Sequence, residues 1–179
     1  DFEMNNYKDN IEGNTNRKKV RIRWYGDLKG IIQSPCLEIK IKRGEIGYKD
    51  KSDLNNFELI ENFLLEYEKI KKNIKKLNKY YIIANLRPTL VNRYQRSYYE
   101  SYNKEFRLTL DQKLEYYIFF NRRVSFFQNY KQQKSVIVEL KYNTQYSYKA
   151  SEVSNQFPFR LSKSSKYVMG IDKIKPYIF

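Results

Sequence analysis

The sequence has no histidine and only one cysteine, and these absences exclude several chemistries. Without histidine there is no Ser-His-Asp triad, no imidazole general base and no histidine metal site. The single thiol, Cys36, excludes an intramolecular disulfide and a thiolate zinc site, and it is compatible with a reducing compartment. Any metal ion must therefore be bound by oxygen atoms, which favours Mg²⁺ or Mn²⁺.

Long hydrophobic runs are also missing. No apolar stretch approaches the roughly 18 residues of a membrane-spanning helix, and the N-terminus is too polar for a signal peptide. We therefore expect a cytoplasmic protein with no membrane span in this chain. Its 179 residues predict a single domain, over residues 1–179, that can bury a core. The sequence does not predict an oligomeric state.

Negative charge is scarce, because 35 lysine and arginine residues stand against 20 aspartate and glutamate residues, for a formal net charge of +15. The stretch from Lys19 to Gly26 alternates strictly, which is typical of a β-strand with two different faces. Its apolar face carries Val20, Ile22 and Trp24, and its charged face carries Lys19, Arg21 and Arg23. Three cations in a row repel one another, so this face favours an anionic partner.

Four further segments predict strands with one charged face. They are residues 37–42, 92–96, 106–111 and 136–141. Their charged faces carry Glu38, Lys40, Arg96, Arg107, Asp111, Glu139 and Lys141. The second and third of these segments predict an antiparallel pair, and a further basic set near the C-terminus contains Lys163 and Lys166.

The remaining segments predict a helix and connections. From Asp53 to about Asn78, apolar residues recur at three- and four-residue spacing, which predicts a helix capped by Asp53. Residues 44–53 predict a polar connection, and residues 144–158 predict a loop with a short helix. The aromatic residues of 116–130 fit either strand or helix, and we expect them in the core.

If the predicted sheet closes, its charged face turns inward and lines a hydrated tunnel. The cations of this face outnumber its carboxylates, so a polyanion would offset their mutual repulsion. Glu38, Asp111 and Glu139 are suited to bind a divalent ion that bridges phosphate oxygens. This pattern favours phosphoryl transfer, in which positioning and charge neutralisation provide the catalysis. Ordinary surface ion pairs on a mixed sheet are the alternative interpretation.

Six short motifs resemble one family in its order and roughly its spacing. They are Lys19-Val20-Arg21-Ile22-Arg23-Trp24-Tyr25-Gly26, Leu37-Glu38-Ile39-Lys40, Tyr94-Gln95-Arg96, Arg107-Leu108-Thr109-Leu110-Asp111, Glu139-Leu140-Lys141 and Ser165-Lys166-Tyr167. The chain thereby resembles the VTC domain family, the polyphosphate polymerases of the triphosphate tunnel metalloenzyme (CYTH-like) superfamily. The resemblance implies an α+β fold, an antiparallel β-barrel of about eight strands with a charged interior and peripheral helices. It also implies transfer of the γ-phosphate of ATP onto a growing polyphosphate chain, with Mn²⁺ or Mg²⁺.

The resemblance gives each matching residue an expected role. The residues expected to hold the triphosphate and act in catalysis are Arg21, Arg23, Lys40, Arg96 and Lys166. Further phosphate-binding residues are expected at Lys19, Arg107, Lys141 and Lys163. Glu139 resembles the family's metal ligand, and Glu38 is the second carboxylate expected to bind the divalent ion.

The start of the chain departs from the family pattern. Family members open with a strand carrying a Glu-x-Lys motif and with a Tyr-Phe-Asp strand, whereas this chain begins near where those strands end. We therefore expect an N-terminally shortened domain, in which Asp1 and Phe2 are the tail of the second strand.

Three other functions fit parts of the same pattern. Water in place of the acceptor phosphate would make a hydrolase of tripolyphosphate or of another triphosphate. Absence of the opening strands favours a non-catalytic binder of polyphosphate or inositol phosphates. A nucleic-acid-binding module is the least favoured, and no nucleic-acid partner is expected. In such a module the cations would cluster with exposed aromatic residues, whereas here they alternate along strands with carboxylates among them.

Overall fold

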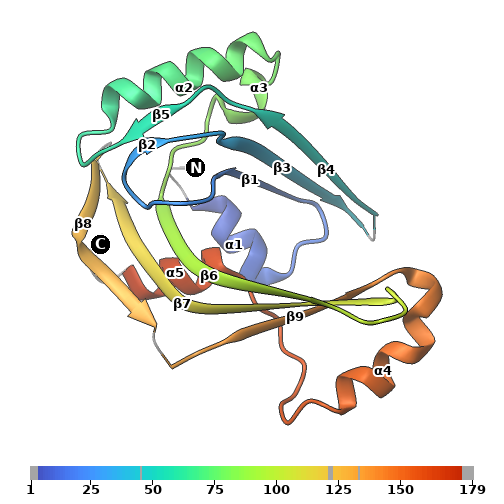
Figure 1. Ribbon diagram of the computed structural model, residues 1–179. Coiled ribbons are helices and arrows are strands. Elements are labelled where there is room, and N and C mark those ends of the chain that lie inside the picture. Colours follow the sequence, from blue (N-terminus) through green and yellow to red (C-terminus); the bar gives the residue numbers. More distant parts are fainter. Residues whose placement is uncertain (1–3, 45, 121–122, 133, 175–179) are drawn as a thin grey trace.

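The protein, in a computed structural model that describes residues 4–44, 46–120, 123–132 and 134–174, has an α+β fold built on antiparallel sheets (Figure 1). Each of the five predicted strand segments corresponds to a β-strand, which confirms these predictions except at two ends: the strand of the first segment stops at Arg23, before Gly26, and the strand of the last segment begins at Ile137, one residue later than predicted. The strand end expected at Asp1 and Phe2 lies outside the described residues. None of the described helices is long and apolar enough to cross a lipid bilayer.

The first sheet contains the cationic strand. It consists of β1 (Arg17–Arg23), β3 (Cys36–Arg43) and β4 (Ile46–Asp53), in the order β1-β3-β4. Pairing places Lys19 opposite Lys40 and Arg21 opposite Glu38, so the charged residues of β1 and β3 share one face. The alternate residues of both strands turn to the other face, where they pack in the main core.

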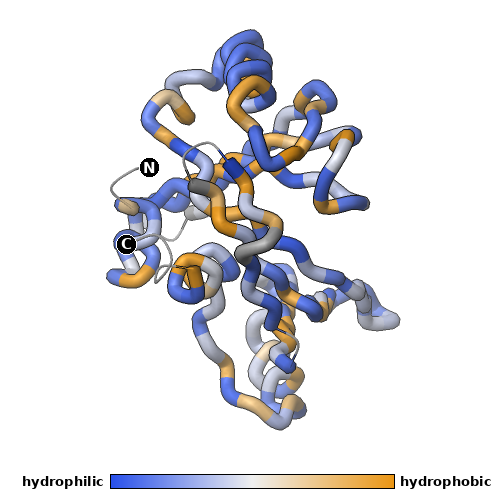
Figure 2. Tube along the Cα trace, turned by 90° about the vertical axis from the view of Figure 1, so that its left-hand side faces the viewer, coloured by the Kyte–Doolittle hydropathy of each residue, from blue (hydrophilic) through white to orange (hydrophobic). Residues whose placement is uncertain are grey.

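The main core lies between the first sheet and the layer that covers it. A short pair, β2 (Gly30–Ile32) with β5 (Phe57–Leu59), and the helices α2 (Leu64–Lys76) and α3 (Tyr80–Ile83) form that layer. Helix α2 contributes Ile70 and Ile74 to the core, and its outer turns are hydrophilic (Figure 2). The long second sheet adds Tyr117 and Phe119 to the same core, so the prediction that the aromatic residues of 116–130 are buried is confirmed for these two, whereas Tyr130 is exposed.

The second sheet is organised around one long strand. Its strands are β6 (Leu90–Glu100), β7 (Phe106–Phe120), β8 (Arg123–Gln132) and β9 (Ile137–Tyr142). The first half of β7 pairs with β9 and the second half pairs with β8, while β6 pairs along both halves. The register shifts between Arg93 and Gln95, opposite Lys113, whose φ is 51°. This irregularity separates a charged half of β7 from an aromatic half.

Two helices lie beside the second sheet (Figure 1). Helix α5 (Lys166–Ile174) packs on β6, β7 and β8, where Ile171 and Ile174 join Tyr116 in a second core. Helix α1 (Asn5–Glu12) packs against both α5 and β1. Beyond the end of β9, the turn η1 (Thr144–Tyr146) and helix α4 (Ser147–Asn155) fulfil the predicted loop with a short helix.

The predicted helix from Asp53 is wrong over its first part. Helix α2 begins only at Leu64, after Phe63 as N-cap, and Asp53 ends strand β4. Phe57 and Leu59 are buried with the exposed Glu58 between them, which is the alternation of a strand. The short apolar alternation decides the local structure because β5 can pair with β2 over the main core.

The predicted polar connection at residues 44–53 is also wrong, because most of it is strand β4. This edge strand has no apolar face in its sequence. Its core-side residues, Asp50 and Ser52, instead bond to Lys79, with 2.6 Å between the Asp50 carboxylate and the Lys79 ammonium. When the polar residues on the inner face of a strand are paired with a lysine, the strand has no alternation of hydrophobic residues. Its sequence then gives no period-two signal of a strand.

The strands of the described residues do not close a barrel, in contrast to the expected closed architecture. Closure requires each edge strand to pair with the next one. Among the described residues, no strand of the first sheet pairs with a strand of the second, and α1 packs between β1 and α5. The coarser expectation, an α+β fold with antiparallel sheets, is confirmed.

Candidate functional site

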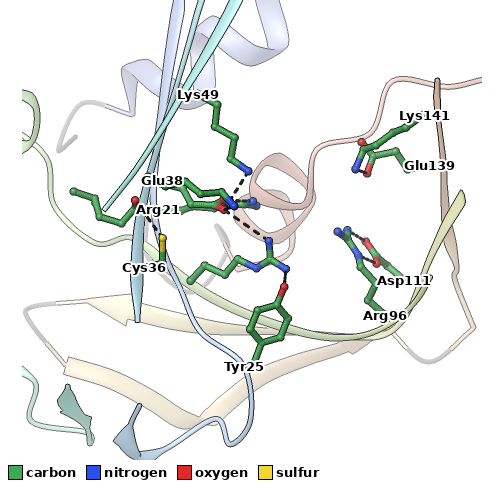
Figure 3. Close-up of polar contacts among 12 residues, drawn as sticks. Arg21, Tyr25, Cys36, Glu38, Lys49, Arg96, Asp111, Glu139 and Lys141 are labelled. Atoms are coloured by element: carbon green, nitrogen blue, oxygen red, sulfur yellow. Dashed lines mark hydrogen bonds and ion pairs between the residues drawn. The ribbon is translucent and has the colours of Figure 1, made fainter. Parts of the chain in front are cut away.

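A cluster of cations surrounds one buried carboxylate in the first sheet (Figure 3). Glu38 is only 3% exposed, and Arg21 Nε donates a hydrogen bond to its Oε2 at 2.6 Å. Lys49 Nζ lies 3.2 Å from Oε1, with Arg23 at 3.7 Å and Lys51 at 3.9 Å. Burial alone would raise the pKa of Glu38, but the hydrogen bonds and charges of Arg21 and Lys49 hold it below its ordinary value. One negative charge thus faces four positive charges.

The same face carries lysines directly opposite one another. Lys19, Lys40 and Lys49 form a row across the three strands. Like charges at such positions destabilise a sheet. Among the described contacts, Lys19 and Lys40 form no ion pair.

Lys19 is exposed to water but has a lowered pKa, a combination that describes its surroundings. Its side chain is exposed to water, yet burial, followed by the charges of Arg21, Lys166 and Lys40, lowers its pKa to about 8. Both hold for a side chain that reaches water and has protein on several sides. Lys166 belongs to α5, so one of these sides is the helix that packs on the second sheet.

A second buried carboxylate organises the second sheet. Asp111, in β7, is 1% exposed and accepts two hydrogen bonds from Arg96 of β6, at 2.5 Å from Nε and 2.7 Å from Nη2. Lys166, at the start of α5, forms an ion pair with the same carboxylate and lies 4.7 Å from the ring centre of Tyr94. Although burial would raise the pKa of Asp111, hydrogen bonds from Arg96 and Lys166 keep it low. This arrangement fixes both cations in place.

The outer part of the same face is more exposed. On β9, Lys141 Nζ lies 3.2 Å from Glu139 Oε2, and both side chains are about half exposed. Pairing places Arg107 opposite Lys141 and Thr109 opposite Glu139. These residues lie on the face of Asp111 because they alternate with it along β7 or are paired with such residues.

The two charged faces look toward a common space (Figure 3). Arg23 of β1 donates a hydrogen bond to the hydroxyl of Tyr25 and reaches the hydroxyl of Tyr98 on β6 at 3.5 Å. Lys19 and Lys166 are close enough for their charges to interact. The sheets therefore bring together cations that are far apart in the sequence.

Eight of the nine predicted phosphate-binding cations lie on these faces or at the start of α5. They are Lys19, Arg21, Arg23, Lys40, Arg96, Arg107, Lys141 and Lys166. Lys163 is the exception, because its ammonium donates a 2.7 Å hydrogen bond to the carbonyl of Asn10 in α1. Among the described contacts it joins neither cluster.

The carboxylates differ in their fitness for a divalent ion. The oxygens of Glu38 and Asp111 are engaged by cations, so a metal ion would have to compete with arginine and lysine side chains there. Glu139 is 49% exposed and has one ionic partner, so it fits as a single carboxylate ligand of an ion shared with phosphate oxygens. Within the described ranges, no three aspartate, glutamate or cysteine side chains gather into a metal site of their own.

Sequence reasoning missed several residues of the site. Lys49 and Lys51 alternate in β4, and this alternation of charge was the available signal for a strand on the cationic face. Tyr25 and Tyr98 are exposed aromatic residues that contact Arg23, and the contact of Tyr98 depends on the arrangement of two sheets. No local sequence pattern predicts a contact between two sheets.

Comparison with protein families agrees with this geometry. A family model of the VTC domain matches residues 1–175, which is nearly the whole chain. The chain belongs to the VTC domain family. This family is linked to polyphosphate metabolism. A search of curated proteins finds no match to the chain.

Proposed function

We propose that this VTC domain is a polyphosphate polymerase that transfers the γ-phosphate of ATP onto a polyphosphate chain between its two cationic faces. One observation carries the proposal: cations of two separate sheets and of α5 meet around a common space, and they outnumber the carboxylates there. Repulsion among them is best relieved by a ligand with several negative charges. ATP and polyphosphate are such ligands.

The first face is suited to bind phosphate groups. Lys19 and Lys40 have no described carboxylate partner, and Arg21 and Arg23 share one carboxylate with two lysines. Arginine can bind phosphate through two hydrogen bonds, whereas lysine contributes a point charge. We assign Glu38 the role of orienting these side chains and not that of a metal ligand.

The second face is suited to stabilise the transition state. Arg96 and Lys166 are oriented by Asp111 before any ligand binds. Charges that are fixed in advance need no reorganisation when negative charge shifts during the reaction. They would face the oxygens of the transferred phosphoryl group, and Arg107 and Lys141 would hold the polyphosphate chain further along β7 and β9.

The reaction needs no nucleophilic side chain. A terminal oxygen of the polyphosphate attacks the γ-phosphorus, the bond from that phosphorus to the β,γ-bridging oxygen breaks, and ADP leaves. Glu139 is the proposed carboxylate for Mn²⁺ or Mg²⁺. Bound there, the ion would neutralise charge on the phosphate oxygens.

The experiment is incubation of the protein with ATP and Mn²⁺, followed by a gel stained for polyphosphate and an assay for orthophosphate. The polymerase makes long chains, whereas orthophosphate alone would identify a hydrolase of the same fold. Arg21→Ala with Arg23→Ala should abolish product, while Lys72→Ala, an exposed cation of α2 away from both faces, should not. No product and no binding of ATP, tripolyphosphate or polyphosphate would contradict the proposal.

A second candidate is a non-catalytic binder of polyphosphate or inositol phosphates. The observation in its favour is that the two buried carboxylates of the site are neutralised by cations, so one half-exposed glutamate is left for a metal among the three. This candidate predicts that tripolyphosphate raises the melting temperature equally with and without Mn²⁺. It also predicts that ATP is not consumed.

A further inference from the structure

One buried hydroxyl on the second face has no partner. Thr109 lies in β7, the central strand of the charged face, and is 5% exposed. Its Oγ1 makes no hydrogen bond among the described residues. A buried hydroxyl without a partner is unfavourable, and such groups in folded proteins call for an explanation.

The register of the sheet identifies the neighbours of this hydroxyl. Thr109 is paired with Tyr98 on one side and with Glu139 on the other. Arg107 and Asp111 precede and follow it on the same face of β7. The hydroxyl is therefore in the row that lies between the Asp111 cluster and the paired cations Arg107 and Lys141.

Oγ1 is too buried for a ligand to reach directly, so the neighbouring side chains are the candidates for its partner. Asp111 has both oxygens engaged by Arg96 and Lys166. The hydroxyl of Tyr98 is engaged with Tyr25 and Arg23. Glu139 remains: its Oε2 is paired with Lys141, and no described contact engages its Oε1.

We propose that Thr109 is a positioning residue for Glu139. When Glu139 turns from Lys141 toward a divalent ion that arrives with the triphosphate, Thr109 Oγ1 donates a hydrogen bond to the free carboxylate oxygen. Directly paired residues of antiparallel strands have Cβ atoms about 4.5–5.5 Å apart, which allows this contact by a change of side-chain rotamer. Hydrogen bonds from such outer groups orient metal ligands, and their loss commonly lowers metal affinity about 10- to 100-fold. The inference rests on the proposed function, in which Glu139 binds the metal.

The test measures the affinity for tripolyphosphate with and without Mn²⁺ in the full chain and in two variants. Thr109→Val keeps the shape but removes the hydroxyl, and Thr109→Ser keeps the hydroxyl. The expected result is that Mn²⁺ tightens tripolyphosphate binding by the native protein and by Thr109→Ser. In Thr109→Val this gain should fall at least tenfold, while binding without Mn²⁺ stays the same. Because Val removes an unpaired hydroxyl, its melting temperature should not fall.

Three results would overturn the inference. The first is a Thr109→Val variant that gains as much affinity from Mn²⁺ as the native protein. The second is an equal loss in the Ser and Val variants, which would show a packing effect. The third is a native protein that binds tripolyphosphate without any gain from Mn²⁺, which would leave anion binding intact while removing the metal from Glu139. Failure of the proposed function looks different, because tripolyphosphate would then not bind under either condition.

Discussion

Two buried carboxylates occupy equivalent places in the two sheets, but their surroundings differ. Asp111 has two cationic partners, Arg96 and Lys166, whose side chains are 17% and 18% exposed. Glu38 has four, and three of them are more exposed: Arg21 is 42%, Lys49 44% and Lys51 58% exposed. The Asp111 cluster has one carboxylate for two cations and is largely buried. The Glu38 cluster has one carboxylate for four cations, an excess of positive charge that water and ions can reach.

This difference separates a rigid part of the site from a responsive part. The Asp111 cluster is satisfied by its own hydrogen bonds, so a ligand changes it little. The Glu38 cluster and the lysine row beside it remain repulsive until an anion binds. The protein thus combines one face whose geometry is fixed by folding with another whose charge is balanced by the ligand.

The largest expected effect comes from neutralising the two carboxylates in turn. Asp111→Asn leaves two largely buried cations without a counter-charge, which should cost roughly 3 kcal/mol of unfolding free energy. Glu38→Gln leaves four cations that repel one another, but water screens this repulsion. The cost in unfolding free energy should therefore be roughly 1 kcal/mol. Melting temperatures of the two variants give the comparison, with Asp111→Asn lower.

Salt provides the control for this pair. Repulsion among the exposed cations of Glu38→Gln is screened by added salt, so moderate NaCl should recover most of its lost stability. Asp111→Asn should recover much less, because its cations are buried. Equal losses with equal recovery would show that the two clusters do not differ in the way described.

A smaller effect is expected where α5 meets the second sheet. A Cβ on Gly170 would lie 2.5 Å from Leu90 Cδ2 and 2.6 Å from Tyr116 Cδ1, so Gly170→Ala must displace the helix or the ring. Overpacking of this kind costs about 1–3 kcal/mol, against about 1 kcal/mol gained in helix propensity. We expect a net loss of about 1 kcal/mol and weaker tripolyphosphate binding, since Lys166 begins this helix.

The matched variant is Gly47→Ala in β4, where an added Cβ meets no atom within 4 Å. It should leave both melting temperature and binding unchanged. If Gly170→Ala is as stable and binds as tightly as Gly47→Ala, then close packing of α5 does not position Lys166.

The sequence predicted the site where charge alternates with apolar residues. Lys19, Arg21 and Lys40 were found because a strand with a hydrophobic face gives a period of two. Strand β4 gave no such signal, because Asp50 and Ser52 face Lys79 instead of a hydrophobic layer. The sequence therefore predicts a polar connection for Lys49 and Lys51, which lie in strand β4.

Contacts between distant segments were beyond prediction from local pattern. Lys163 and Lys166 belong to one short basic set, yet one bonds to α1 and the other to Asp111. Their separation depends on where α5 begins and how α1 packs beside it. Closure of a sheet into a barrel also depends on contacts between distant segments, which no local pattern predicts.

A substitution in the lysine row should change stability little and weaken anion binding clearly. Lys40→Ala removes a repulsive charge, so the melting temperature should stay equal or rise slightly, while tripolyphosphate affinity falls about tenfold, or about 1.4 kcal/mol. Lys72→Ala on α2 removes the same charge away from the site and serves as the control. A loss of stability in Lys40→Ala, with binding equal to that of Lys72→Ala, would assign Lys40 a structural role.

The smallest expected effect is a proton taken up when the anion binds. The pKa of Lys19 is about 8, lowered by burial and by Arg21, Lys166, Lys40 and Arg17, so much of this lysine is neutral at pH 8.5 in the free protein. A bound polyanion favours the charged form and raises the pKa, so binding should take up part of a proton at pH 8.5 and weaken as the pH rises further.

Calorimetry of tripolyphosphate binding in two buffers of different ionisation enthalpy measures this uptake, and Lys19→Gln should abolish it. The stability of the fold depends on pH with the opposite sign from ligand binding. Because the unfolded chain keeps the ordinary lysine pKa of 10.5, it binds more protons than the folded protein between about pH 8 and that value, so stability should rise with pH in this window. Proton uptake that persists in Lys19→Gln would show that a group other than Lys19 takes up the proton. Its absence in the native protein would mean that the lysine row is already relieved without a ligand, and the contrast between the two faces would then disappear.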